Sequence, residues 1–99
     1  MVGQTERGVL RGRDEADVMT WFGENGLTAY GWGNAPGDTY GWHDHAYEKV
    51  LCCVQGSITF HTDNGDMVLE AGDRMILPAR TRHAATVGPA GCRCVEAPR

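Results

Sequence analysis

The stretch GDTYGWHDHAYEKVLCCVQG, residues 37–56, decides how this chain can fold. His43 and His45 lie two residues apart within it, so both side chains point to the same face of an extended strand. The segment KVLCCV that follows, residues 49–54, is apolar on both faces, which is typical of a strand covered on both sides. The stretch therefore predicts two strands, the first of which presents a pair of imidazoles side by side.

The rest of the chain also reads mostly as β-structure. From residue 33 onward, turn residues recur about every 8–12 positions, as in sandwiches and barrels of short strands. Asn64-Gly65 is a strong hairpin signal, and Gln55-Gly56 predicts a further turn. The expected strands lie at 27–32, 39–45, 49–54, 57–62, 68–69, 75–77, 82–87 and 92–96. One helix is expected at about 14–22, with Asp14 as its N-cap.

The composition favours a small soluble protein of one domain, residues 1–99. The chain has 99 residues, of which 41% are hydrophobic, enough for one modest core. Its net charge is −4 and its basic residues are scattered, so we expect no nucleic-acid partner. No apolar run has the length of a signal peptide or a membrane span, so we expect a cytoplasmic protein that contacts no membrane. The four cysteines lack zinc-knuckle spacing and are expected to be reduced and buried.

Two stretches of the sequence resemble the two motifs of the cupin superfamily. The first motif, a glycine followed by His-x-His and a later glycine, matches at Gly37, His43, His45 and Gly56. The second matches GDRMILPARTRH at Gly72, Pro78 and His83. The second motif departs from the family pattern twice, because Arg80 occupies a glycine position and Val87 occupies an asparagine position.

The resemblance implies a fold and a cofactor. The fold is an all-β, small antiparallel β-barrel, also called a double-stranded β-helix or jelly roll, with a short N-terminal helix and the barrel over about 27–97. Two same-face histidines on one strand and a third on a distant strand converge only if the sheet curls. We therefore expect His43, His45 and His83 to bind a divalent transition metal such as iron, zinc, nickel or manganese. The resemblance further implies a small-molecule ligand and a homodimer.

The residues after the second histidine leave three alternatives open. The cupin carboxylate lies four or five residues beyond that histidine, where this chain has Lys49, whereas Glu48 has the opposite strand parity. In a regular strand, Lys49 faces the pocket and the metal has three histidine ligands. A β-bulge would instead turn Glu48 onto the metal as a fourth ligand. In the third alternative, the Lys49 charge replaces the metal. We expect the first alternative, and we rank ligation by Glu48 a close second.

Further residues complete the predicted site. Lys49 is a candidate for binding an anionic group or for acting as a catalytic base, and Tyr47 and Arg80 are candidates for the substrate pocket. No motif position requires His61, so we expect it to be solvated. Two functions remain open: a metal-dependent enzyme such as an oxygenase or isomerase, and a module that binds a ligand or metal without turnover.

Overall fold

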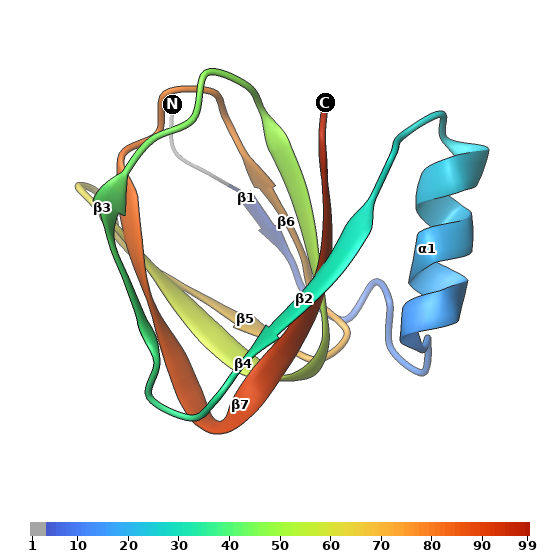
Figure 1. Ribbon diagram of the computed structural model, residues 1–99, viewed down its shortest axis with the longest axis horizontal. Coiled ribbons are helices and arrows are strands. Elements are labelled where there is room, and N and C mark those ends of the chain that lie inside the picture. The colour runs from blue at the N-terminus through green and yellow to red at the C-terminus, as the bar shows by residue number, and fades with distance from the viewer. Residues whose placement is uncertain (1–3) are drawn as a thin grey trace.

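A computed structural model describes residues 4–99, so residues 1–3 of the predicted domain lie outside the described part. One helix and seven antiparallel strands make up the described chain (Figure 1). In order, the elements are β1 (Gln4–Glu6), α1 (Glu15–Glu24), β2 (Tyr30–Asn34), β3 (Thr39–His43), β4 (Lys49–Thr62), β5 (Gly65–Glu70), β6 (Arg74–Leu77) and β7 (His83–Pro98). The predicted all-β jelly roll with a short N-terminal helix is confirmed.

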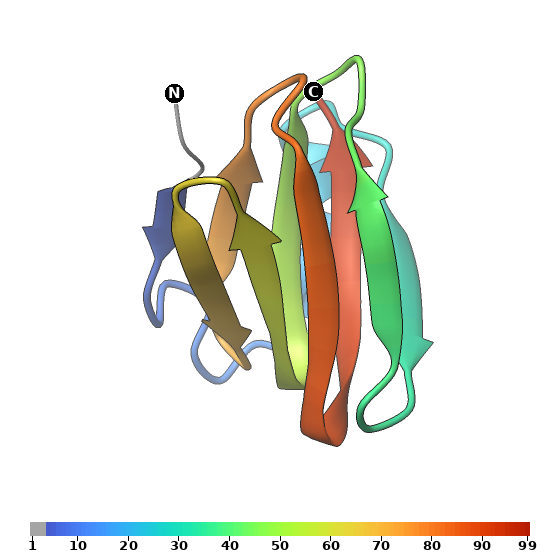
Figure 2. The ribbon, with the colours of Figure 1, turned by 90° about the vertical axis from the view of Figure 1, so that its left-hand side faces the viewer.

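The strands form two layers that share their two longest members, β4 and β7. One layer contains β1, β6, residues 49–54 of β4, residues 92–98 of β7, and β2. The other contains β5, residues 57–62 of β4, residues 83–87 of β7, and β3. Figure 2 shows the strands side by side. Within residues 4–99, no ladder joins β3 to β5, so the barrel is not closed by hydrogen bonds.

Each of the two long strands spans two strands that were predicted as separate, and each bends between them. β4 runs through Gln55-Gly56, and β7 runs through residues 88–91, each with a shift in the register of their shared ladder. Gly56 and Gly91 have φ angles of 68° and 75°, which L side chains rarely adopt. A Cβ on Gly56 would clash with the carbonyl oxygen of Gly91, so the two strands cross closely at the bend. The positions of the bends agree with the predicted strand boundaries, but the structure has one continuous strand on each side of the crossing where two were predicted.

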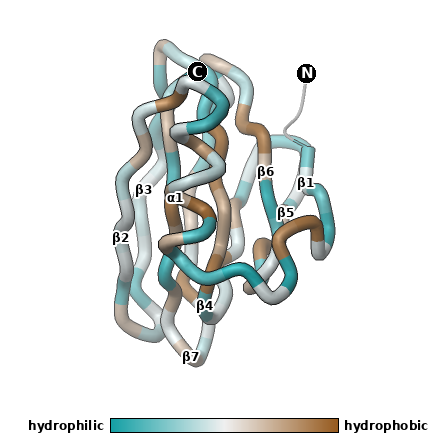
Figure 3. The backbone as a smooth tube through the Cα atoms, turned by 90° about the vertical axis from the view of Figure 1, so that its right-hand side faces the viewer, coloured by the Kyte–Doolittle hydropathy of each residue, from teal (hydrophilic) through white to brown (hydrophobic). Residues whose placement is uncertain are grey.

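Helix α1 covers the outer face of the first layer. Asp14 is its N-cap, as predicted: its carboxylate accepts from the Asp17 amide, and the Asp17 side chain accepts from the Asp14 amide. The helix runs two residues further than predicted, to Glu24. Its buried residues Val18 and Phe22 face the strands, and Figure 3 shows hydrophobic stretches in the strands behind the helix. In the part of the chain that the structure describes, no helix is long and apolar enough to cross a membrane.

Alternation along β4 divides the apolar residues between two cores. Val50 and Cys52 face α1, whereas Leu51 and Cys53 face the space between the layers. This confirms the prediction that residues 49–54 are covered on both sides. All four cysteines are buried and free, and burial raises the pKa of the Cys52 thiol to about 12. They act as small core residues, as expected.

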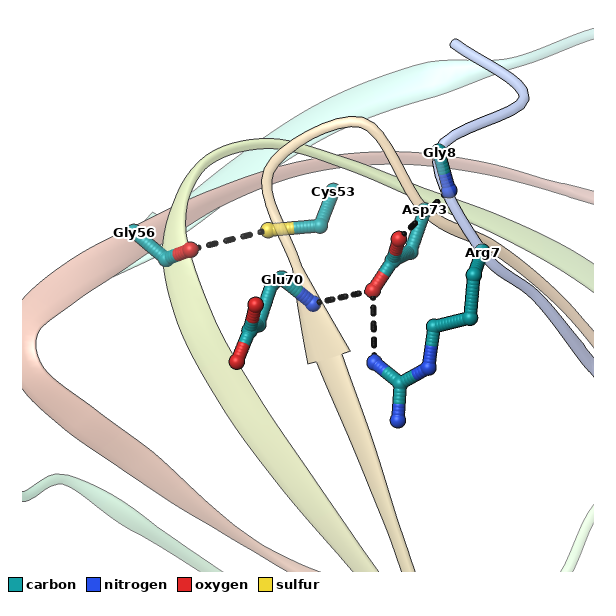
Figure 4. Close-up of polar contacts among 6 residues, drawn as sticks. All are labelled: Arg7, Gly8, Cys53, Gly56, Glu70 and Asp73. Carbon is teal, nitrogen blue, oxygen red and sulfur yellow. Dashed lines mark hydrogen bonds and ion pairs between the residues drawn. The ribbon is translucent and has the colours of Figure 1, made fainter. Parts of the chain in front are cut away.

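A buried aspartate ties the chain before α1 to the turn before β6. The Asp73 carboxylate accepts hydrogen bonds from Arg7 Nη1 at 2.8 Å, the Gly8 amide at 2.8 Å and the Glu70 amide at 2.9 Å (Figure 4). Burial opposes ionisation of Asp73, but these donors outweigh it and hold the pKa of the carboxyl below its usual value. The aspartate thus fixes the end of the barrel opposite the histidines.

Candidate metal centre

The fold brings the three predicted histidines together from three places in the chain. His43 ends β3, His45 follows it in the loop before β4, and His83 begins β7. One ring nitrogen of each lies within 4.8 Å of one ring nitrogen of the others. His83 is 2% exposed, and His45 is half-buried. Antiparallel pairing of β3 with β7 places His43 directly opposite His83, which explains how residues 40 positions apart meet.

Backbone carbonyls orient two of the rings. His43 Nδ1 lies 2.6 Å from the Gly41 carbonyl oxygen, and His83 Nδ1 lies 2.8 Å from the Thr81 carbonyl oxygen. Because a carbonyl oxygen only accepts, both Nδ1 atoms carry the proton, and each Nε2 keeps a free lone pair. Metal-binding histidines in proteins are held in this way. The donor set therefore fits a transition metal.

The surroundings of His45 and His83 favour the neutral form of both rings. Burial lowers the pKa of His45, and the nearby positive charge of Lys49 lowers it further. Burial also lowers the pKa of His83, against the opposing effect of its hydrogen bond to Thr81. A neutral imidazole is the form that binds a metal, so both groups are ready to do so at neutral pH.

Lys49, and not Glu48, faces the histidines in this structure. Lys49 is the first residue of β4 and shares its inward parity with Leu51, and its Nζ lies 3.5 Å from His45 Nε2. Glu48 stands before the strand and outside the histidine group, with its carboxylate 2.7 Å from Arg99 Nε. The ladder of β4 with β6 is regular over residues 49–52, so β4 begins with Lys49 inward, as the first of the three alternatives predicts. The regular strand from the histidines to Lys49 that this alternative assumed is wrong, because the predicted strand 39–45 ends at His43 and residues 44–48 form a loop before β4.

The histidines open onto a cavity of about 310 Å³ between the two layers. Its inner wall is apolar, and aromatic side chains stand around the rest. The lining residues are Tyr30, Trp32, Tyr40, His43, His45, Lys49, Leu51, Ile58, Phe60, His83, Ala85 and Glu96. A cavity of this size and character is typical of small-molecule sites.

Two residues expected in the substrate pocket lie outside this lining. Tyr47 is 44% exposed, and its ring lies 5.4 Å from that of His45, at the outer side of the site. The Arg80 side chain is 72% exposed and pairs with Asp44 at 3.6 Å. The Arg80 backbone has a φ of 63°, which accounts for the glycine of the family pattern at this position, and its amide donates to the His45 carbonyl oxygen at 2.7 Å. Arg80 therefore ties the two motifs together through its backbone.

The sequence led to no prediction of a site role for Glu96, which lines the cavity. Glu96 is 4% exposed; its carboxylate lies 2.9 Å from Lys49 Nζ and accepts from Trp32 Nε1 at 2.7 Å. Desolvation and the negative charge of Glu96 raise the pKa of Tyr30 to about 12. The signal was available, because Glu96 shares the inward parity of Cys92 and Cys94 in the last strand.

His61 lies away from the cluster on the opposite face of β4. Its ring nitrogens lie 2.8 Å from the Asp66 carboxylate and 2.8 Å from the Thr86 hydroxyl oxygen. Its side chain is 33% exposed, so it is partly solvated but held at both nitrogens. His61 has no part in the candidate metal centre.

Solved structures of other proteins share this fold. An RmlC-like cupin from Shewanella frigidimarina is 26% identical, with a TM-score of 0.64 over 73% of this chain and 64% of that one. A protein from Neisseria meningitidis is 27% identical, with a TM-score of 0.63 over 74% of this chain and 73% of that one. A Rhizobium leguminosarum protein of unknown function, 17% identical, shares the fold with a TM-score of 0.67 over 73% of this chain and 68% of that one.

No curated protein matches the sequence. The family model described as "Cupin domain" matches residues 33–96, which include all three histidines and both bends of the barrel. The chain therefore belongs to the cupin domain family.

Proposed function

We propose that this protein binds a divalent transition metal through His43, His45 and His83 and uses it to act on a small molecule in the cavity. The observation that carries the proposal is the convergence of three ring nitrogens within 4.8 Å of one another at the wall of that cavity. Iron, zinc, nickel and manganese all suit imidazole ligands. Three protein ligands leave coordination positions for other groups, as catalytic sites require.

The activity we propose is that of an oxygenase or an isomerase. When bound, a metal here would supply a Lewis acid that polarises a substrate oxygen. The chain contributes the rest. The Gly41 and Thr81 carbonyls hold two imidazoles in the metal-binding tautomer, and the apolar wall excludes water. Lys49 places a positive charge beside the reacting region, where it can bind an anionic group or move a proton.

Metal analysis of the purified protein tests the binding site. We expect close to one equivalent of transition metal in the wild type and a loss of at least tenfold in metal affinity in His43→Ala and His83→Ala. His61→Ala is the matched control, because it removes a histidine of the same barrel outside the cluster. Equal metal content in all four proteins would refute the site.

Turnover separates an enzyme from a binding module. With iron bound, oxygen consumption in the presence of candidate substrates would indicate an oxygenase, and conversion without oxygen would indicate an isomerase. Ligand binding without product would favour the alternative of a module that holds a metal or ligand without turnover.

We also propose a domain organisation and an oligomeric state for the protein. We take the chain as a single cupin domain that forms a homodimer, as the resemblance implies. Light scattering coupled to size-exclusion chromatography measures the mass directly, and a monomer would contradict this part. The cytoplasmic location expected from the sequence stays a prediction.

A further inference from the structure

The cavity wall contains an ion pair that stability alone does not explain. Lys49 and Glu96 pair at 2.9 Å, with side chains that are 11% and 5% exposed. Removing both charges from water costs several kcal/mol per ion, and their attraction offsets this only in part, so such pairs add little net stability. Their place beside the three histidines points to a role in binding.

Glu96 holds the lysine in one position. One carboxylate oxygen pairs with Lys49 Nζ, and the other accepts from Trp32 Nε1 at 2.7 Å. The carboxylate is fixed from two sides, so the ammonium it holds is fixed as well. A docking group positioned in this way loses little conformational entropy when a ligand binds.

Metal binding would leave one N–H donor of the Lys49 ammonium without its acceptor on His45. Its Nζ lies 3.5 Å from His45 Nε2, and a metal on that nitrogen would take up the lone pair that the ammonium faces. Among the described residues, Glu96 and His45 are the only side-chain partners of Nζ. A buried donor left without an acceptor costs about 1–3 kcal/mol. A ligand oxygen between the metal and Lys49 would satisfy it.

The rest of the cavity lining indicates the chemical character of the rest of the ligand. Leu51, Ile58 and Phe60 form an apolar wall, with Tyr30 and Tyr40 among the aromatic residues around it. The formal charges of Lys49 and Glu96 cancel, so a bound dication would leave the cavity positive. An anionic group on an apolar body fits both features.

We propose that Lys49 is a ligand-docking residue, that Glu96 is its positioning residue, and that the ligand is a small organic acid with an apolar body. Its carboxylate lies between the metal and Lys49, and its body lies against the apolar wall. This inference rests on the proposed function, because it requires the metal.

Calorimetric titration of the zinc-loaded protein tests the inference with two probes that share a benzyl group. Phenylacetate carries the carboxylate, and benzyl alcohol replaces it with a neutral hydroxyl. We expect phenylacetate to bind about tenfold or more tightly than benzyl alcohol, as one charge-assisted hydrogen bond predicts. Equal affinities would overturn the inference without any variant.

The variant Lys49→Met/Glu96→Gln removes both charges, so the net charge of the cavity is unchanged. The introduced amide oxygen can still accept from Trp32 Nε1, so the change at position 96 leaves that donor with a partner. We expect the preference for phenylacetate to fall at least threefold in this variant and to persist in Arg80→Met, which removes an exposed charge outside the cavity. A smaller fall in the double variant would overturn the inference.

Metal content, measured first, separates the two hypotheses. If the wild type binds none of zinc, iron, nickel and manganese, the proposed function fails and the inference fails with it. If the wild type and the double variant bind zinc equally but show the same preference between the probes, the inference alone fails. A matching near-ultraviolet circular dichroism spectrum shows that the double variant is folded.

Discussion

Replacing Lys49 with methionine should destabilise the metal-free protein far more than replacing Lys49 and Glu96 together. The single change leaves the Glu96 carboxylate, 5% exposed, without its cationic partner; the neutral Trp32 N–H stays at 2.7 Å, and the Tyr30 hydroxyl is a further neutral donor to this carboxylate. Breaking a buried pair in this way costs about 3–5 kcal/mol, because one charge stays buried without compensation. Against a total stability of about 5–15 kcal/mol, that lowers Tm by roughly 12 °C or more.

The double variant removes this cost. In Lys49→Met/Glu96→Gln no buried charge remains, methionine fills the path of the lysine methylenes, and the Trp32 N–H keeps an acceptor. We expect its stability to lie within about 1 kcal/mol of the wild type, or above it. Urea unfolding with a chelator present, followed by tryptophan fluorescence, measures all three proteins. A single variant as stable as the wild type, or a double variant as unstable as the single one, would refute this reasoning.

Three further predictions concern the site and the barrel. The lowered pKa values of His45 and His83 keep both rings neutral below the ordinary value of 6.5, so zinc affinity measured by competition should hold to that pH and fall below it; half-loss above pH 7 would contradict this. Gly56→Ala should abolish or severely impair folding, since its Cβ has no room beside the Gly91 carbonyl, and a circular dichroism melt like that of the wild type would disprove the close crossing. Arg80→Gly should raise the free energy of unfolding by up to about 1 kcal/mol, because glycine adopts a φ of 63° without strain; a loss measured in urea would count against backbone strain at this residue.

The sequence predicted the elements that repeat a simple period and missed those that depend on distant partners. Strand alternation identified the doubly covered segment of β4, because a period of two residues is a local property. Lys49 faces inward as predicted, but the parity count from His45 does not explain it, because a loop at residues 44–48 separates His43 from β4. The positive φ of Arg80 was not predicted, because the residue was noted only as a departure from the glycine of the family pattern. Glu96 escaped notice because its role exists only through Lys49 and Trp32, which are 47 and 64 residues away in the chain. A polar residue at an inward position of an apolar strand is the signal that finds such a partner.

One strand, β7, determines how the ambiguous Glu48-Lys49 pair is arranged. Its first residue, His83, completes the histidine cluster, and further along the same strand Glu96 holds Lys49 from inside the barrel. Just beyond its end, Arg99 holds Glu48 through both its backbone amide, at 2.8 Å from the Glu48 carbonyl oxygen, and its side chain. The antiparallel register of β4 with β7 therefore places a carboxylate on the inner side of Lys49 and an arginine next to Glu48. Two residues adjacent in sequence thus have partners that lie far along the chain, and these partners keep Lys49 inside the barrel and Glu48 outside the histidine cluster.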